Sequence, residues 1–339
     1  MITPVNINEF SNVQAPCFDV RSPLEFEGSA IISSINLPLL NDEHRKAIGI
    51  CYKQKGKAAA IALGYQLVNP IRHAFIENIQ KHTESKSIKL YCARGGLRSH
   101  KMAEFLSENG YDVLLLRGGY KAYRNYILKT IESFNNIYIL SGNTGCNKTG
   151  LLEAMKAKGE HVLNLEALAN HKGSAFGGIG ELSQPSNAQF ANLIFDALKG
   201  YQPEKRLWVE AESISIGKIS IPLELWTNMQ KANGIEIVLP LQERINFIVN
   251  TYGQFDLVAL TEGIRKLSKR LGIETTEALC QMTLNHQLHP VVERLLQYYD
   301  KGYENGRIKK NCQNYVKFEL ESTHADNNCQ LLLQHLQSF

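Results

Sequence analysis

The chain twice repeats one local pattern, and this repeat constrains its fold more than any other feature. A short apolar run leads through a glycine-rich loop into a helical pattern. In the first copy the run spans residues 87–91 and the helical pattern residues 99–109. In the second copy these segments are residues 137–140 and 150–158. Strands alternating with helices predict a parallel α/β sheet, in which ligands bind at the carboxyl ends of the strands.

Length and composition predict more than one domain. A chain of 339 residues is long for a single hydrophobic core. We predict an α/β protein: a parallel-sheet domain over residues 1–134, a second α/β domain with a P-loop over residues 135–254, and a mostly helical extension over residues 255–339. Its 44% hydrophobic and 21% charged residues are typical of a soluble globular protein. The net charge of +4 permits nucleic-acid binding without demonstrating it.

The cysteines and the apolar segments indicate the cellular compartment in which the protein is found. Seven scattered cysteines, an odd number without a CxxC pair, argue against a disulfide framework and against a structural zinc site. The N-terminus lacks a basic region followed by an apolar core, and no run approaches the ~18 apolar residues of a membrane span. We therefore expect a cytoplasmic protein that does not enter the membrane.

The first glycine-rich loop contains the candidate nucleophile, Cys92. The backbone N–H groups of such a loop and the dipole of the following helix bind anions and lower a thiol pKa. Arg94 and Arg98 strengthen both effects, while Gly95 and Gly96 let the loop curl around a phosphate. A buried, inert cysteine is the alternative. The arginines and glycines favour a catalytic role for Cys92, Arg94 and Arg98.

The second glycine-rich loop follows the spacing of a phosphate-binding P-loop, between a strand and a helix. Asn147 replaces the second glycine of the motif, but asparagine tolerates positive φ, so the loop is expected to keep its form. The alternative is an ordinary strand-to-helix turn. The residues expected to bind phosphate or diphosphate are Gly142, Thr144, Gly145, Lys148 and Thr149.

An acidic pair follows another apolar run of the second domain. Residues 207–209 end in Glu210 and Glu212, where a P-loop protein places a carboxylate that coordinates a metal or orients water. We predict these two residues as candidate Mg²⁺ ligands, although the sequence makes no metal site certain.

Three basic segments are candidates for contact with RNA, since lysines bind phosphate and neighbouring aromatic rings stack on bases. The alternative for each segment is an ordinary solvated face, which is the commoner case. The candidate residues are Lys53, Lys55, Lys121, Arg124, Lys266, Lys269 and Arg270.

Together these motifs resemble known families. Asp19-Val20-Arg21, the Cys92 loop and Gly118-Gly119 look like a rhodanese (sulfurtransferase) domain. With the P-loop, residues 171–177 and the acidic pair, they resemble the tRNA 2-selenouridine synthases over about residues 13–303. Three residues depart from that pattern at positions that concern magnesium and nucleotide handling: Asn147, Asn164 and Ala211.

The resemblance implies an activity on tRNA. The substrate is the wobble 2-thiouridine, whose sulfur is geranylated from geranyl diphosphate and then replaced by selenium from selenophosphate. Cys92 carries the selenium as a selenosulfide, and the loop arginines hold the selenophosphate oxyanions. We further predict that Lys148 and the P-loop amides hold the diphosphate of the geranyl donor. No tightly bound cofactor is expected, Mg²⁺ is a candidate, and a selenophosphate-supplying enzyme is a candidate partner besides tRNA.

Other functions fit parts of the sequence. Five residues separate Cys92 from Arg98, which is the phosphate-binding spacing of cysteine phosphatases, and a rhodanese-type sulfurtransferase uses the same loop. The P-loop and the basic segments favour the synthase. A nucleotide-regulated RNA-binding module with an incidental thiol is a third interpretation. The sequence leaves open whether ATP or GTP binds, whether Cys51 or Cys146 resolves an adduct on Cys92, and the oligomeric state.

Overall fold

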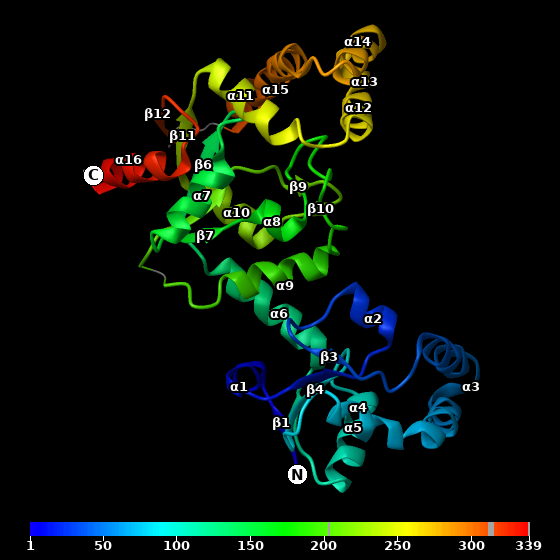
Figure 1. Ribbon diagram of the computed structural model, residues 1–339. Helices are drawn as coiled ribbons and strands as arrows, with labels where there is room; N and C mark the ends of the chain where they lie inside the picture. The colour runs from blue at the N-terminus through cyan, green and yellow to red at the C-terminus, as the bar shows by residue number, and fades with distance from the viewer. Residues whose placement is uncertain (203, 311–314, 338–339) are drawn as a thin grey trace. The chain divides into compact units, whose positions relative to one another are not determined.

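A computed structural model describes residues 1–202, 204–310 and 315–337 (Figure 1). The chain divides into two compact units. The first contains Met1–Thr130 and Ala191–Asp196, and the second contains the rest of the chain. Each unit is built on a five-stranded parallel sheet with helices, so the predicted α/β class is confirmed. Within these described ranges, no helix has the length and apolar character needed to cross a membrane.

The first unit has the strand order β1-β5-β4-β2-β3, with every neighbouring pair parallel. Its strands are β1 (Ile2–Val5), β2 (Cys17–Asp19), β3 (Ile35–Asn36), β4 (Ser87–Tyr91) and β5 (Asp112–Leu116). Its helical segments are α1 (Ile7–Asn12), α2 (Pro23–Gly28), α3 (Asp42–Val68), the 3₁₀ helix η1 (Asn69–Ile71), α4 (His73–Gln80), α5 (Leu97–Glu108) and α6 (Gly119–Glu132), with the middle of α9 (Asn187–Ala197).

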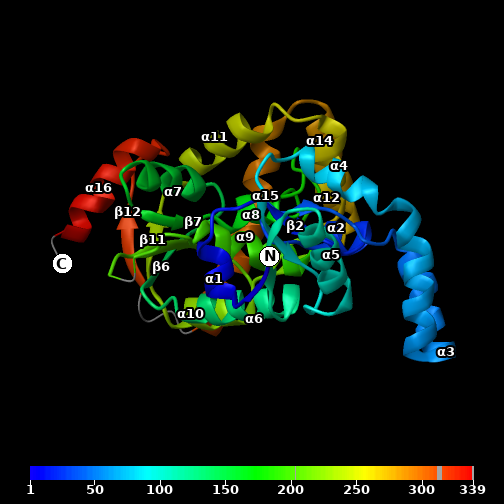
Figure 2. The same cartoon turned by 90° about the horizontal axis from the view of Figure 1, so that it is seen from below.

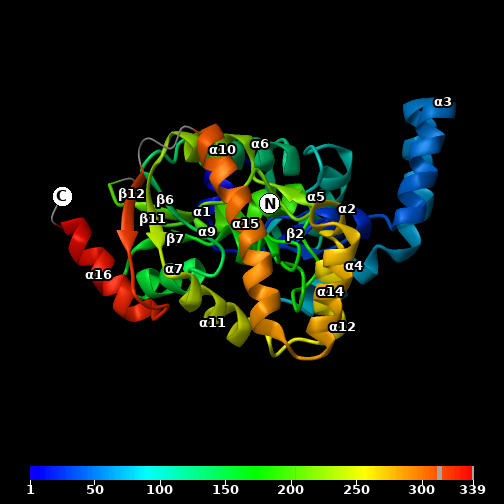
Figure 3. The ribbon, with the colours of Figure 1, turned by 90° about the horizontal axis from the view of Figure 1, so that it is seen from above.

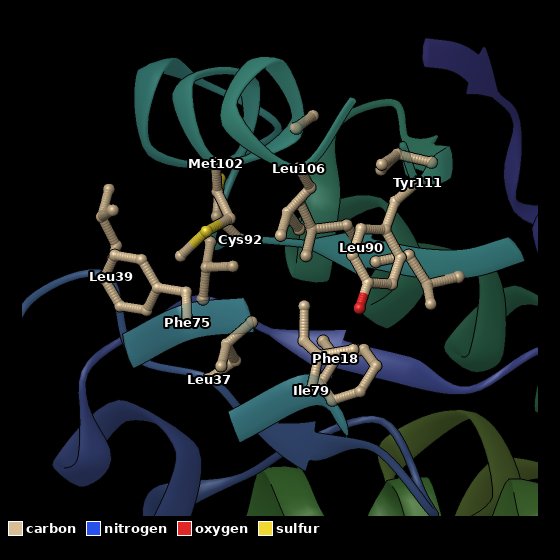
Figure 4. Close-up of a cluster of buried hydrophobic side chains, with 14 of the residues drawn as sticks. Phe18, Leu37, Leu39, Phe75, Ile79, Leu90, Cys92, Met102, Leu106 and Tyr111 are labelled. Carbon is tan, nitrogen blue, oxygen red and sulfur yellow. The ribbon is translucent and has the colours of Figure 1, made fainter. Parts of the chain in front are cut away.

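The core of the first unit lies between its sheet and the helices α4 and α5 (Figure 4). Ile88 and Leu90 alternate along β4 and are fully buried, which follows from the two-residue period of a strand. Phe75 of α4 and Met102 and Leu106 of α5 pack in the same cluster. This packing places the loop between β4 and α5 at the edge of the core.

A buried ion pair fixes the end of β2. Arg21 donates from Nη2 to Oδ2 of Asp19 at 2.6 Å and to the carbonyl oxygen of Ser29 at 2.6 Å. The Arg21 guanidinium also lies 4.2 Å from the centroid of the Tyr120 ring, within cation–π distance. Both charges are nearly inaccessible to water, since 5% of the Arg21 side chain and 0% of the Asp19 side chain are exposed.

Helix α3 extends outward from this sheet (Figure 2) and changes direction at Gly56. Gly56 has φ +84°, a conformation that side-chain-bearing residues rarely adopt. Nothing lies within 4 Å of the position of a Cβ there, so backbone conformation rather than crowding favours glycine. The residues on both sides of this kink therefore belong to two differently directed helical segments.

The second unit has the strand order β12-β11-β6-β8-β7. These strands are β6 (Ile137–Gly142), β7 (His161–Leu163), β8 (Leu207–Glu210), β11 (Asn233–Val238) and β12 (Tyr315–Glu319), beside an antiparallel pair, β9 (Ser215–Ile216) and β10 (Ile219–Ser220). The helices are α7 (Lys148–Ala157), α8 (Leu165–Ala169), α10 (Leu223–Lys231), α11 (Leu241–Tyr252), α12 (Leu257–Arg265), α13 (Ser268–Leu271), α14 (Ile273–Leu284), α15 (Leu288–Lys310) and α16 (Ala325–Gln337).

The region after residue 254 packs within this second unit. Helix α15 contacts α11 and α14, and α12 contacts α14, which forms a helical layer (Figure 3). The same region supplies β12, which pairs in parallel with β11, and α16, which packs on α7 (Figure 1). The described residues of the predicted helical extension are therefore mostly helical and include one outer strand of the sheet.

The buried ion pair of the first unit generates a stability prediction. Asp19→Asn leaves the Arg21 guanidinium buried without its counter-charge, so the free energy of unfolding is expected to fall by ~3–5 kcal/mol. Urea denaturation of the purified protein measures this loss. Asp112→Asn is the control, because Asp112 is 69% exposed and pairs with the N-terminal ammonium, and its expected cost is below ~1 kcal/mol. Equal costs for the two variants would contradict the prediction.

Candidate active sites

The Cys92 loop is held against a second turn of the first unit. Cys92 directly follows β4, and its carbonyl oxygen accepts a hydrogen bond from the Tyr120 N–H at 2.8 Å. The carbonyl oxygen of Ala93 accepts from the Lys121 N–H at 3.0 Å. Gly119 has φ +57°, and a Cβ there would collide with the Cys92 carbonyl oxygen and the amide of Gly95. The two turns therefore pack backbone to backbone, which requires glycine at position 119.

The Cys92 thiol points into the core. The residue is 2% exposed and belongs to the cluster that contains Leu39, Phe75 and Met102 (Figure 4). Its Sγ lies 3.0 Å from Oγ of Ser99, a hydroxyl from the first turn of α5. Side chains along a strand alternate between its two faces. Cys92, which directly follows β4, continues the alternation of Ile88 and Leu90 and so faces α5.

The two arginines of the loop do not contact the Cys92 thiol in the hydrogen bonds and ion pairs of the described residues. Arg94 is exposed, while Arg98 donates from Nη1 to Oε2 of Glu25 at 2.6 Å. Glu25 also pairs with Arg45 at 2.9 Å. Burial favours the neutral Glu25, but the hydrogen bond and charge of Arg98, with Arg45, outweigh it and lower the pKa of Glu25 to about 2. The sequence predicts that Arg94 and Arg98 bind anions beside the Cys92 thiol, but in this structure Glu25 holds Arg98 and the thiol is buried in the core.

The P-loop keeps its form despite Asn147. This residue has φ 50° and ψ 42°, the left-handed conformation that the sequence predicted it would tolerate. Its Oδ1 accepts from the Gly150 N–H at 3.2 Å and so caps α7, and its Nδ2 donates to the carbonyl oxygen of Thr323 at 2.8 Å. Asn147 thus ties the loop to the segment that precedes α16.

Lys148 and Thr149 lie beside the end of β8. Lys148 Nζ donates to the carbonyl oxygen of Gly142 at 3.1 Å and lies 3.4 Å from Oε1 of Glu210. The Thr149 hydroxyl lies 3.5 Å from Oε2 of the same carboxylate. The register of β6 with β8 pairs Leu140 with Glu210, which brings the two strand ends together. A P-loop lysine and an acidic strand end therefore share one site, as the motif spacing predicts.

A third carboxylate, Glu166, completes the acidic group. Carboxylate oxygens of Glu166, Glu210 and Glu212 lie within 4.8 Å of one another, close enough to hold one cation. Glu166 is not among the ligands predicted from the sequence. A signal was present, because Glu166 comes shortly after strand β7, much as Glu210 stands at the end of strand β8. Asn164, one of the departures from the family pattern, caps α8 by accepting from the Ala167 N–H at 2.9 Å.

Two carboxylates of the acidic group, Glu166 and Glu212, have raised pKa values. Burial and the charge of Glu210 raise the pKa of Glu166. The same two causes raise the pKa of Glu212, and in both cases the charge of Lys148 opposes the shift. Carboxylate oxygens are hard ligands, so this group is suited to a hard divalent cation such as Mg²⁺.

A cavity of about 600 Å³ opens beside these residues in the second unit. One part of its wall is polar and contains Lys148, Thr149 and the acidic group. The remainder is largely apolar and comes from α11, α12, α14 and α15, with Phe176 and Tyr299. Its apolar lining residues include Phe247, Ile248, Leu260, Ile264, Val291, Val292, Leu295 and Leu296. The cavity can therefore take a ligand with a charged head and an apolar body.

The other candidate thiols differ in accessibility. Cys146 is 2% exposed within the core beneath the P-loop, and burial raises the pKa of its thiol. Its Sγ lies 3.8 Å from the carbonyl oxygen of Ile237. Cys51 is half-buried on α3. Only Cys51 of this pair is partly accessible.

The basic candidates occupy three kinds of position. Arg124 is half-buried and donates to Oδ1 of Asn192 at 3.0 Å. Arg270 is exposed and donates to the Tyr298 hydroxyl at 2.8 Å. The remaining candidates are exposed lysines: Lys53 and Lys55 on α3, Lys121 on α6, and Lys266 and Lys269 at α12 and α13.

Comparison with known proteins matches both units. Residues 6–126 match the rhodanese-like domain, and residues 135–328 match the tRNA 2-selenouridine synthase AAA domain. The tRNA 2-selenouridine synthase of Shewanella sediminis (strain HAW-EB3) is 36% identical over 348 residues, which cover 91% of this chain and 92% of that protein. This chain belongs to the tRNA 2-selenouridine synthase family.

Two further family members show the same extent of similarity. The synthase of Hydrogenovibrio crunogenus (strain DSM 25203 / XCL-2) is 33% identical over 332 residues, 88% of this chain and 91% of that protein. That of Psychromonas ingrahamii (strain DSM 17664 / CCUG 51855 / 37) is 34% identical over 331 residues, 88% of this chain and 89% of that protein. The resemblance inferred from the motifs is confirmed, with a rhodanese-like domain followed by a P-loop domain. The roles of individual site residues stay predictions.

The raised pKa of Glu166 generates a prediction about pH. With a chelator present, Glu166→Gln is expected to stabilise the protein by about 1–2 kcal/mol at pH 8 and to have no effect at pH 5. The folded chain binds the Glu166 proton more tightly than the unfolded chain. Its contribution to stability is therefore present below the ordinary glutamate pKa of ~4.3 and is lost as pH rises.

Thermal unfolding of both proteins between pH 5 and pH 8.5 measures this difference. Glu153→Gln provides a control at an acidic residue outside the acidic group. A Glu166→Gln effect that is equal at both ends of the pH range would contradict the assigned direction of the pKa.

Proposed function

We propose that this chain is a tRNA 2-selenouridine synthase that converts the wobble 2-thiouridine of tRNA to 2-selenouridine through an S-geranylated intermediate. The names of its relatives and its family membership support the overall reaction. The observation that carries the two-step version is the cavity of the second unit, where a phosphate-binding loop adjoins apolar walls. Geranyl diphosphate combines a diphosphate with a branched hydrocarbon chain, and this cavity is suited to both parts.

In the first step, the P-loop holds the diphosphate while the geranyl chain lies along the helical walls. Lys148 and the loop amides bind the anion. The thiouridine sulfur forms a bond to C1 of the geranyl group, the bond from C1 to the diphosphate oxygen breaks, and the base loses its N3 proton. The apolar walls keep water from C1, which would otherwise hydrolyse the donor.

Magnesium fits the acidic group of this site. Three carboxylates would repel a diphosphate, and Lys148 alone offsets only part of that charge. Glu166, Glu210 and Glu212 provide oxygen ligands within 4.8 Å of one another. Bound Mg²⁺ would neutralise charge that develops on the departing diphosphate. We therefore propose Mg²⁺ as an ion bound by this group, and we propose no tightly bound organic cofactor.

In the second step, selenium replaces the geranylated sulfur. A bond forms between selenium and C2 of the base, and the bond from C2 to sulfur breaks so that geranylthiol leaves. Cys92 is the proposed selenium carrier. Loading from selenophosphate forms the S–Se bond to Cys92 and breaks the P–Se bond, whose two electrons stay on phosphorus, so phosphite leaves. After this selenium has bonded to C2, a second thiol must cleave the S–Se bond: it forms a disulfide with Cys92, and the electrons of the broken bond stay on selenium. Direct attack by selenophosphate, with hydrolysis of its phosphorus–selenium bond, is the balanced alternative that needs no carrier.

The phosphatase alternative lacks support in this geometry. A cysteine phosphatase needs its thiolate and its arginine to face one phosphate. Here the Cys92 thiol contacts Ser99, and Arg98 is bound to Glu25. Selenium transfer at Cys92 in turn requires the neighbouring side chains to move so that the thiol becomes accessible. A selenophosphate-supplying enzyme remains a proposed partner, and the tRNA substrate favours a cytoplasmic location.

Two substitutions are expected to separate the two steps. Lys148→Ala should reduce geranylation of 2-thiouridine tRNA at least ~100-fold, because it removes the charge that holds the diphosphate. It should leave selenation of pre-geranylated tRNA intact. Cys92→Ala should abolish selenation and leave geranylation unchanged. Mass spectrometry of nucleosides from both reactions measures each product.

The half-buried Cys51 offers a matched control, and Cys51→Ala is expected to retain both activities. If Lys148→Ala loses both activities, or neither, the assignment of geranylation to the P-loop is contradicted. Selenation that persists in Cys92→Ala would favour direct attack by selenophosphate.

Binding of tRNA is expected to weaken steeply as salt rises, because lysines release counterions from phosphates. Replacing both Lys53 and Lys55 by alanine should reduce the slope of log K against log [salt] by ~1–2. Filter binding at several salt concentrations measures the slope. An unchanged slope would remove these two exposed lysines from the RNA-binding surface.

A further inference from the structure

The first unit contains a second cavity that the proposed steps have not used. It is a groove of about 430 Å³ lined by α3, α4 and α5, within the size range of small-ligand sites. Leu39, Phe75 and Met102 line it, and the same three side chains pack around Cys92 in the core cluster (Figure 4). The groove therefore lies on the other side of the side chains that cover the thiol.

The open side of this groove is aromatic and basic. Tyr52 and Tyr65 line it and are 58% and 44% exposed. Four cationic side chains, Lys57, Arg72, Arg98 and Lys101, also line it and outnumber the two carboxylates of the lining, Glu104 and Glu108. Lys101 pairs with Glu104 at 2.6 Å and Arg98 with Glu25, while Lys57 is exposed just after the kink of α3 at Gly56.

We propose that this groove binds the geranylated wobble base of tRNA, with the hydrocarbon chain on the apolar floor. This inference rests on the proposed function, because it requires the S-geranyl intermediate. Three observations together select this occupant. The apolar floor suits a hydrocarbon, the exposed tyrosines suit stacking on an unpaired RNA base, and the basic side chains suit phosphates.

A free prenyl diphosphate could place its hydrocarbon chain on the apolar floor and its phosphates beside the cationic side chains. It has no aromatic base that could stack on the exposed tyrosines. A prenylated nucleotide uses all three features at once. The groove would thus select the intermediate over unmodified 2-thiouridine tRNA before selenium is inserted. It would also place the hydrocarbon chain against Leu39, Phe75 and Met102, which must move for Cys92 to become accessible.

Binding of two RNAs to the full chain tests this proposal. The probes are an anticodon stem-loop with S-geranyl-2-thiouridine at the wobble position and the same RNA with 2-thiouridine. The geranylated RNA is expected to bind at least ~10-fold more tightly, or ~1.4 kcal/mol. Ile48→Trp, which fills the groove from α3, should reduce this preference to less than about twofold. The matched control is Ile50→Trp, because Ile50 is on the same helix, is 46% exposed and lies outside the lining.

Selenation of the geranylated RNA provides the second readout. The selenation rate of Ile48→Trp should fall at least ~10-fold. Its geranylation of 2-thiouridine RNA should be unchanged, because that step is assigned to the second unit. Unchanged geranylation also shows that the second unit is correctly folded. If Ile48→Trp unfolds the first unit, Tyr52→Ala replaces it, since Tyr52 is exposed. This variant should weaken binding of the geranylated RNA by ~5–10-fold through lost stacking.

The outcomes separate the groove from the proposed function. Equal affinities of the wild type for the two RNAs, or equal preferences in Ile48→Trp and Ile50→Trp, would overturn the groove assignment alone. Complete displacement of the geranylated RNA from the groove by geranyl diphosphate at equal concentration would assign it to the free donor and overturn the proposal. A wild type that binds the geranylated RNA selectively but never selenates it would overturn the function and retain the groove.

Discussion

The close approach of three carboxylates away from water governs the chemistry of the second unit, with Glu210 buried and Glu166 and Glu212 half-buried. Glu166, Glu210 and Glu212 approach one another because parallel strands end at one edge of the sheet. Lys148 lies 3.4 Å from Glu210 and offsets part of this negative charge. Burial, followed by the charge of Glu210, therefore raises the pKa values of Glu166 and Glu212. A site of this kind takes a divalent cation and an anionic ligand together more readily than either alone.

The departures from the family pattern have structural roles here. Asn147 adopts the backbone conformation that a glycine would supply, and its side chain caps α7 and reaches Thr323. Asn164 caps α8 and so helps to fix the helix that contains Glu166. The Ala211 N–H donates to the carbonyl oxygen of Leu140 at 2.9 Å, a bond that depends on the backbone alone. The loop and the acidic group thus keep their positions without the usual side chains.

The first unit buries its thiol among apolar side chains, whereas the charged groups of the second unit line a cavity. Cys92 lies among apolar side chains, and Glu25 holds Arg98 away from it. The same apolar side chains form the floor of a groove with exposed tyrosines. A ligand in that groove would act on the side chains that cover Cys92. Protection of the thiol and recognition of an apolar substrate are therefore properties of one set of residues.

Local sequence determined much of this protein. The alternation of apolar runs, glycine-rich loops and helical patterns predicted the parallel α/β class, and the spacing of Gly142, Lys148 and Thr149 predicted the P-loop. These features depend on contacts within a few residues, as does the positive φ of Asn147. Tertiary structure alone decided that Glu166 joins the acidic group, that Glu25 takes Arg98, and that Cys92 faces the core. Each depends on which distant segment packs alongside, and no local pattern encodes that choice.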